Sequence, residues 1–181
     1  MKRKRKSKLL EYRKIILPLV LLLVIVALAS YILLKDFLFP SIISVPELST
    51  QGYTEVAIGI NITDERGIVS LAGNCYELSM VVDRSQAISI ESGINRIIGQ
   101  RPNTHDLIKD MLKNLNANIL MIKITEMKEG TYYSRIILRK GNLILSLDSR
   151  PSDALAIAAR TEYEVPVYVK DTLLKTGMKI C

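Results

Sequence analysis

Two stretches of the sequence place an arginine, a proline and an aspartate at the start of a predicted helix. The first, QRPNTHDLIKD, begins at Gln100, and the second, SRPSDALAIAAR, begins at Ser149. A proline disfavours helical backbone in the residue before it, so we expect Arg101 and Arg150 in extended backbone just outside the two helices. A helix start already favours an anion, and a guanidinium adds a rigid fork of donors. The pattern therefore predicts two arginines that bind phosphate oxygens.

Further polar side chains follow each proline. Thr104 and Ser152 carry hydroxyls that suit either a helix cap or a phosphate contact. His105 is the only histidine of the chain, and an imidazole suits proton transfer near neutrality. We expect His105, Asp106 and Asp153 to be catalytic. Carboxylates at these positions are also predicted to hold a divalent cation, Mg²⁺ or Mn²⁺, with the ligands Asp106, Asp148 and Asp153.

A purely structural interpretation explains the same residues. Arg101 could pair with Asp153, and Arg150 with Asp106, which would clamp two helix starts together without any ligand. In that case the neighbouring hydroxyls are ordinary caps. The residues alone leave the clamp and the functional site open.

A second group of side chains is typical of surfaces that bind single strands. Tyr132 and Tyr133 are followed by Arg135 and Arg139 within TYYSRIILRK. Stacking rings combined with basic side chains favour single-stranded nucleic acid. Because side chains alternate along a strand, one of the two tyrosines must face the core.

Hydrophobic periodicity predicts an α+β fold, in which a mostly antiparallel or mixed sheet packs with two to three helices. Thr104 should cap the second helix, and Pro166 suggests an edge for the last strand. We expect helices over residues 84–99, 105–115 and 152–161, and strands over residues 53–63, 68–73, 75–83, 118–126, 131–140, 142–148 and 165–170.

The positive charge is concentrated at the N-terminus. The formal net charge is +7, and residues 1–14 hold eight Lys or Arg and one acid, so the remainder of the chain is neutral. Residues 15–34 carry no charge and are long enough for one transmembrane helix. The positive-inside rule places the N-terminus in the cytoplasm and the domain outside it, as a single-pass membrane protein. A signal peptide cleaved near Ala29 is the competing interpretation, and it also exports the domain.

These features divide the chain into five parts. They are a basic tail (1–14), a transmembrane helix (15–34), a linker (35–52), a globular domain (53–176) and a C-terminal tail (177–181). The two cysteines, Cys75 and Cys181, are too few for a disulfide scaffold, and one bridge between them stays open for an exported domain.

Three segments together resemble the bifunctional nuclease domain family: RPNTHDLIKDMLKNLNANI, ITEMKEGTYYSRIILRKGN and LDSRPSDALAIAARTEYEVPVYV. The resemblance runs from about Tyr53 to Thr176. It implies a compact α+β domain, often a homodimer, with nuclease activity on DNA and RNA. The family's characteristic polar residues fall here on Arg101, Thr104, His105, Asp106, Asp148, Arg150, Ser152 and Asp153.

Two departures from the family pattern bear on function. Family members usually carry Glu where this chain has Gln86, and most are soluble and intracellular. We therefore expect a membrane-anchored, nuclease-like protein that hydrolyses phosphodiester bonds of DNA or RNA. The alternative is a non-catalytic, membrane-tethered module that binds a phosphorylated ligand or a protein partner, which the neutral charge of the domain favours.

Overall fold

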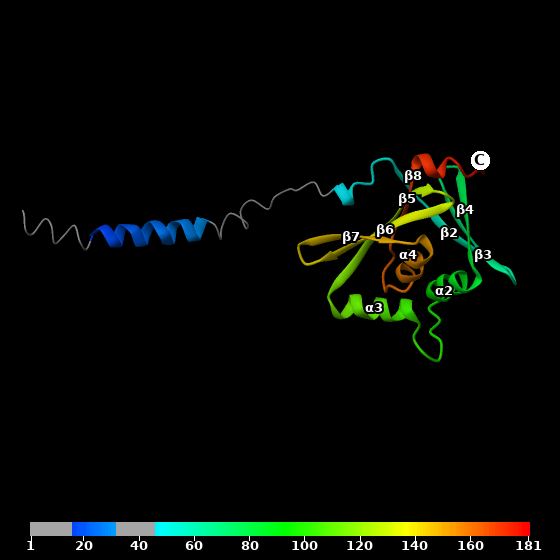
Figure 1. Cartoon of the computed structure of the whole chain (residues 1–181), viewed down its shortest axis with the longest axis horizontal. Helices are drawn as coiled ribbons and strands as arrows, with labels where there is room; N and C mark the ends of the chain where they lie inside the picture. Colours follow the sequence, from blue (N-terminus) through cyan, green and yellow to red (C-terminus); the bar gives the residue numbers. More distant parts are fainter. Residues whose placement is uncertain (1–15, 32–45) are drawn as a thin grey trace, which may run out of the picture. The chain divides into compact units, whose positions relative to one another are not determined.

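The computed structural model describes residues 16–31 and 46–181 (Figure 1). A helix covers residues 16–31, and the residues from 46 onward form a separate compact unit. No helix within the described residues is both long and apolar enough to cross a membrane. The span expected over residues 15–34 extends beyond the described residues at both ends, and the basic tail lies outside them.

Two sheets form the globular unit, which confirms the α+β class with mixed and antiparallel pairing. The five-stranded sheet is mixed because β5 and β8 are parallel, whereas its other neighbours are antiparallel. Its order is β1 (Tyr53–Glu55), β8 (Val167–Lys170), β5 (Ala117–Lys128), β6 (Thr131–Lys140) and β7 (Leu143–Ser149). The four-stranded sheet is antiparallel, in the order β2 (Ala57–Ile62), β3 (Arg66–Gly73), β4 (Tyr76–Asp83) and β9 (Met178–Lys179).

Three helices lie on one side of the five-stranded sheet in Figure 1: α2 (Arg84–Ile94), α3 (Thr104–Asn114) and α4 (Pro151–Ala158). The short α5 (Asp171–Leu174) and the 3-10 turn η1 (Pro46–Leu48) complete the elements. Seven of the eight residues of α4 are buried, as its Ala-rich sequence predicts. Gly93 lets α2 approach α4, because a Cβ at this position would lie 2.9 Å from the Ala159 side chain.

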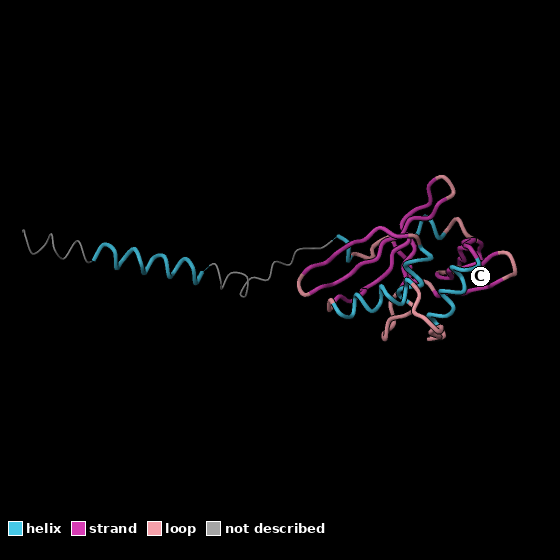
Figure 2. Tube along the Cα trace, turned by 60° about the horizontal axis from the view of Figure 1, so that its bottom comes forward, coloured by secondary structure: helices cyan, strands magenta, loops and turns pink. Residues whose placement is uncertain are grey.

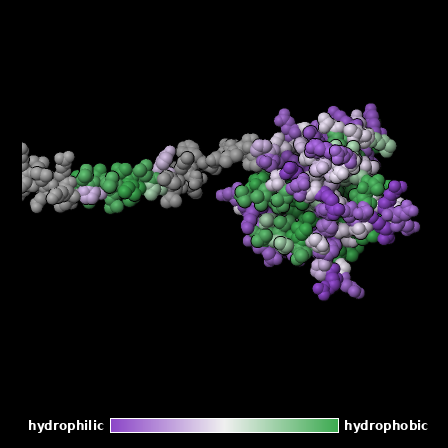
Figure 3. Space-filling model, in the orientation of Figure 1, coloured by the Kyte–Doolittle hydropathy of each residue, from purple (hydrophilic) through white to green (hydrophobic). Residues whose placement is uncertain are grey.

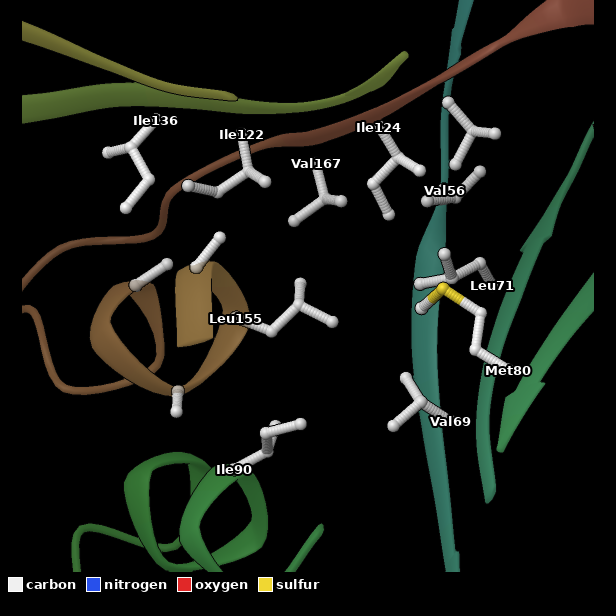
Figure 4. Close-up of a cluster of buried hydrophobic side chains, with 14 of the residues drawn as sticks. Val56, Val69, Leu71, Met80, Ile90, Ile122, Ile124, Ile136, Leu155 and Val167 are labelled. Carbon is white, nitrogen blue, oxygen red and sulfur yellow. The ribbon is translucent and has the colours of Figure 1, made fainter. Parts of the chain in front are cut away.

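The core fills the space between the two sheets and around α4. Leu155 of α4 lies near its centre, with Ile90 of α2 below it in Figure 4. The side chains that meet there from the strands include Val56, Val69, Leu71, Met80, Ile122, Ile124, Ile136 and Val167. This core fixes α2 and α4 against both sheets, and these helices carry much of the polar site described below.

The C-terminus is part of the fold. Cys75 and Cys181 form a disulfide with a Cα–Cα distance of 5.1 Å, and the N–H of Ile180 donates to the Cys75 carbonyl at 2.9 Å. Strand β9, within the predicted tail, pairs with β4. The bridge that the sequence left open is therefore formed.

Several expected boundaries differ from the structure. The strand predicted over residues 53–63 is two strands in different sheets, because the chain passes from one sheet to the other around Val56. Pro166 precedes β8, and β8 is an inner strand between β1 and β5, so the predicted edge is wrong. The Pro166 carbonyl accepts from the Ile122 N–H instead, and the proline sits where no donor is required.

Candidate functional site

Asn103, and not Thr104, caps α3. The Asn103 side-chain oxygen accepts from the N–H groups of His105 (2.9 Å) and Asp106 (3.0 Å). In return the Asp106 carboxylate accepts from the Asn103 N–H at 2.8 Å, which completes a capping box. The predicted cap is wrong because Thr104 is already the first helical residue, and its side chain is exposed.

Asp106 forms a shielded ion pair with Arg160. The Arg160 Nε donates to Asp106 Oδ1 at 2.5 Å, and the two side chains are only 6% and 13% exposed. Another guanidinium nitrogen donates to the carbonyls of Ser89 (2.8 Å) and Ala156 (2.7 Å). Burial alone would raise the pKa of Asp106, but the Asn103 N–H and Arg160 outweigh it and lower this pKa. The pair ties α2, α3 and the end of α4 together.

The second Arg-Pro stretch is built differently. Arg150 is itself the N-cap residue of α4, in the extended backbone that the sequence predicted, and Pro151 is the first helical residue, one position before the expected start at Ser152. The Arg150 side chain donates two hydrogen bonds to Asp153, at 2.7 and 3.0 Å. Burial would raise the pKa of Asp153, but Arg150 and, to a smaller extent, His105 lower it overall. Ser152 is buried and does not cap the helix.

His105 links the two stretches. Its Nε2 lies 3.4 Å from Asp153 Oδ1, and its Nδ1 lies 2.9 Å from Ser89 Oγ. The imidazole comes from α3, the hydroxyl from α2 and the carboxylate from α4, and all three side chains are partly buried. Serine, histidine and aspartate thus form one hydrogen-bonded chain.

The direction of this chain follows from the donors around Ser89. Its oxygen accepts from Arg160 at 3.2 Å and from the Asn103 amide at 3.5 Å, so the Ser89 O–H is left to donate to His105 Nδ1. An ionised Asp153 can only accept, so Nε2 must carry the proton of the neutral imidazole. The surroundings therefore select the Nε2–H tautomer and make Nδ1 the basic nitrogen.

A pocket of about 380 Å³ adjoins the second stretch. Arg66, Arg150 and Ser152 are among the residues that line it, at the N-terminal end of α4. Gln86 also lines the pocket, and its side-chain oxygen accepts from the Asp83 N–H at 3.3 Å as part of a capping box. Cations and helix N–H groups at one opening suit an anion such as phosphate.

The structure does not bring all the predicted residues together. Arg101 and Thr104 are exposed, and in the part of the chain that is described neither side chain has a protein hydrogen-bond partner. Asp148 lies opposite Arg135 on β6, on the sheet face away from α4, because alternate residues of β7 point to opposite faces. Neither pair of the predicted clamp forms, since Asp153 pairs with Arg150 and Asp106 with Arg160.

The side chains expected to bind a divalent cation are not arranged as a metal site in the described residues. Among the described residues, no group of three or more His, Cys, Asp and Glu side chains is placed to hold a metal ion. Two of the three expected ligands, Asp106 and Asp153, are engaged by guanidinium groups. The cation stays a prediction, and no chemical step below depends on it.

Sequence reasoning missed three members of the site. Ser89 lies within a predicted amphipathic helix, where a serine gives no signal of its own. Asn103 gives an ambiguous signal because Thr104, another residue that often caps helices, follows it directly. Arg160 carries no local signal of its role, since its partner Asp106 lies 54 residues earlier in the chain.

Known proteins resemble this chain over the same region. Residues 70–179 match the bifunctional nuclease domain. An uncharacterized protein of Mycobacterium tuberculosis strain H37Rv is 33% identical over 97 residues, which are 54% of this chain and 56% of that protein. Bifunctional nuclease 1 of Oryza sativa subsp. japonica is 33% identical over 112 residues, 60% of this chain and 33% of that protein. Bifunctional nuclease 1 of Arabidopsis thaliana is 25% identical over 107 residues, 57% of this chain and 32% of that protein.

The matched segments thus span about half of the mycobacterial protein and a third of the plant proteins. The matched domain covers more than half of the present chain and contains both Arg-Pro stretches, Ser89 and Arg160. By this match, the chain belongs to the bifunctional nuclease domain family.

Proposed function

We propose that the protein hydrolyses phosphodiester bonds of nucleic acid at the opening beside Arg150. The observation that carries this proposal is the chain Ser89–His105–Asp153, which ends at an exposed guanidinium. It combines a group that can move a proton with a cation that can hold a phosphate. The plant relatives that are named bifunctional nuclease support the same assignment.

Arg150 is placed to hold the phosphate. Two of its five N–H donors are used by Asp153, and the side chain is 66% exposed, so three donors remain for ligand oxygens. Arg66 and the first N–H groups of α4 add positive potential at the same pocket. Asp153 fixes the direction of the Arg150 fork before substrate arrives, which lowers the entropic cost of binding.

His105 supplies the proton transfer. The attacking water replaces the long Asn103 amide contact on Ser89 Oγ (3.5 Å) and passes a proton to this oxygen as the Ser89 hydroxyl gives its own proton to His105 Nδ1. Asp153 then stabilises the imidazolium, whose Nε2–H already points at it. The imidazolium then gives a proton back through Ser89 to solvent, the leaving oxygen takes a proton from solvent, and the neutral ring is restored. Such acid–base assistance contributes about 10²- to 10⁴-fold to a rate.

Cleavage by the purified full-length chain tests the proposal. Single- and double-stranded DNA and RNA are incubated with the wild type and with His105→Asn, each in EDTA, Mg²⁺ or Mn²⁺. We expect cleavage by the wild type and a loss of at least 100-fold in a folded variant. Equal cleavage by both proteins would sink the assignment of His105. Dependence on an added cation would support the expected Mg²⁺ or Mn²⁺.

One observation favours the non-catalytic alternative. Asp106 and Asp153, the two carboxylates that the sequence predicted to be catalytic, already have guanidinium partners, as in a purely structural cluster. A membrane-tethered module of this kind would bind a phosphorylated ligand at Arg150 without turnover. Binding of an oligonucleotide with no cleavage in any of the cation conditions would favour it.

For localisation we propose a single-pass protein that is anchored through residues 15–34, with the N-terminus in the cytoplasm and the domain outside. The Cys75–Cys181 disulfide supports export, because such bonds persist in oxidising compartments. Labelling intact cells with a membrane-impermeant thiol reagent, with and without prior reduction, tests this. Labelling that appears only after reduction supports export. Two free thiols protected in intact cells would contradict it.

We also propose that the domain forms a homodimer. Five apolar side chains on α3 and β7 are each about half exposed: Leu107, Met111, Leu115, Leu143 and Leu147. Figures 1 and 2 show α3 and the β6–β7 hairpin side by side, and Figure 3 shows hydrophobic surface over this region. Patches of this kind mark contact surfaces. Light scattering of the wild type and Met111→Glu should give a dimer and a monomer, and two monomers would contradict the proposal.

A further inference from the structure

The face of the five-stranded sheet that points away from α4 carries side chains that the proposed site does not use. Along β6, Ile136 and Leu138 point to the core, so Arg135, Ile137 and Arg139 point to the opposite side. We call this side the open face.

Only one tyrosine of the Tyr132–Tyr133 pair lies on the open face, where a ligand can reach it. Tyr132 packs against the core, whereas Tyr133 lies on the open face and is 38% exposed. The ammonium of Lys128 lies 5.8 Å from the Tyr133 ring centroid. An exposed ring next to a cation is a stacking platform for a planar group.

Two arginines follow Tyr133 on the same face. Arg135 and Arg139 are exposed, and within the described part of the chain neither forms an ion pair. Asp148 stands across from Arg135 in the β6–β7 register without closing a salt bridge to it. The two arginines are four residues apart, or roughly 13 Å along a strand. This spacing suits separate phosphates of an extended chain better than one compact anion.

A trough of about 740 Å³ continues from Arg135 across the sheet. Thr125 and Ile137 line it from the strands, and Gln51 and Tyr53 line it from the segment that precedes β1 and from β1 itself. A volume of this size accommodates a nucleotide-sized ligand.

Lys123 holds the far wall of the trough in place. Its side chain is 5% exposed, and its Nζ donates to the carbonyls of Glu47 (2.6 Å) and Ser49 (2.5 Å). The same ammonium lies 5.1 Å from the Tyr53 ring centroid. The segment before β1 is thus fastened to the sheet, and the wall exists before any ligand arrives.

We propose that the open face binds single-stranded nucleic acid, with a base stacked on Tyr133 and phosphates at Arg135 and Arg139. The inference rests on the proposed function in taking nucleic acid as the ligand, and it adds single strands as the preferred class. The bases of a duplex are stacked on each other and cannot reach Tyr133, whereas unpaired bases can. The interaction needs no particular base sequence, because every base offers a ring face.

Binding is measured by fluorescence anisotropy with a labelled oligothymidine and with a duplex of equal length. The full-length chain carries His105→Asn throughout, so that cleavage does not interfere. We expect Tyr133→Ala to weaken single-strand binding about 5- to 100-fold. The double change Arg135→Ala and Arg139→Ala should weaken it further and should reduce the slope of log K against log salt by about 1.4.

Arg96→Ala is the matched control, since Arg96 is an exposed arginine in the α2–α3 connection, away from the open face. It should bind like the parent, and thermal unfolding should show that all variants are folded. Unchanged affinity in the open-face variants, equal affinity for the duplex, or no binding by the parent protein would overturn the proposal. Absence of cleavage by the wild type with intact, Tyr133-dependent binding would defeat the proposed hydrolysis and leave this inference standing.

Discussion

The two Arg-Pro stretches contain nearly the same residue types but form different structures. In the second, Asp153 follows Arg150 by three residues, and the two side chains pair on one helix start. In the first, Asp106 follows Arg101 by five residues, bonds back to Asn103 and pairs with Arg160 from a distant part of the chain. Arg101 is left exposed. A difference of two residues in spacing thus separates an accessible cation from a shielded structural pair.

The two stretches have different roles, one structural and one chemical. Asp106 and Arg160 are nearly covered, so their role is to hold α3 against α2 and α4. Arg150 faces solvent, and Asp153 is within reach of the imidazole. His105 is part of the first stretch in the sequence, but its side chain contacts Asp153 of the second stretch. The first stretch therefore positions His105, and the second provides Asp153, which contacts the imidazole, and Arg150, which is exposed to the ligand.

Asp153→Asn should produce the largest effect. The amide cannot stabilise an imidazolium as a carboxylate does, so kcat/KM for oligonucleotide cleavage should fall about 10²- to 10⁴-fold. Stability should change little, because Arg150 is exposed to water and needs no partner. Kinetics and urea unfolding of the same preparation measure the two effects. A large loss of stability with cleavage retained would reverse the roles that we assign to the two stretches.

Asp106→Asn should act on stability instead. The change leaves Arg160 buried and without its counter-charge, which should lower the free energy of unfolding by about 3 kcal/mol. Asn103→Ala removes the cap and the long amide contact to Ser89, and it should cost about 1 kcal/mol. Chemical denaturation measures both values. If Asp106→Asn proved no more costly than Asn103→Ala, the buried pair would contribute nothing beyond the cap.

Acid should weaken the first stretch through the same carboxylate. The folded-state pKa of Asp106 is lowered, so its ionised form adds stability that is fully present above its ordinary value of 3.8. This stability is lost as the pH falls through the lower, folded-state pKa. Urea midpoints measured from pH 6 down to pH 2 should therefore fall more steeply below pH 3.8 for the wild type than for Asp106→Asn. Parallel curves would show that Asp106 is not the group responsible.

Arg101→Ala should have the smallest effect. Its side chain has no protein hydrogen-bond partner in the described structure, so stability should stay within about 0.5 kcal/mol of the wild type. The matched change Arg150→Ala should raise KM for oligonucleotides, because it removes the phosphate contact. Steady-state kinetics of the two variants compare the arginines directly. A larger rise in KM from Arg101→Ala would move the phosphate site to the first stretch.

Local sequence signals predicted the local parts of this structure. The Ala-rich pattern after Ser149 predicted a helix, and the structure begins that buried helix at Pro151, one residue before the expected start. The gaps between the strands predicted over 118–126, 131–140 and 142–148 hold the two hairpin turns, where the positive φ values of Gly130 and Gly141 suit glycine. The α+β class was predicted from the hydrophobic periodicity, which changes along the chain between the two-residue period of strands and the 3.6-residue period of helices.

The remaining parts depend on contacts between distant segments. Nothing local distinguishes Arg160 from any other helix-end arginine, and only the packing of α3 on α4 brings it to Asp106. The predicted placement of Asp148 beside Asp153 is wrong, because the two residues are close in the sequence but Asp148 lies opposite Arg135 on β6. The pleat of β7 turns that side chain away from the helices.

Ser89 and Asp153 should hold the His105 imidazole in a single protonation form, and that form can be measured. The chain has a single histidine, so a long-range ¹H–¹⁵N spectrum of the labelled protein reports this ring alone. At a pH where the ring is neutral, we predict a proton on Nε2 and a bare Nδ1 in the wild type, and a mixture of tautomers in Ser89→Ala. A wild-type ring protonated on Nδ1, or one averaged between the two tautomers, would contradict the account.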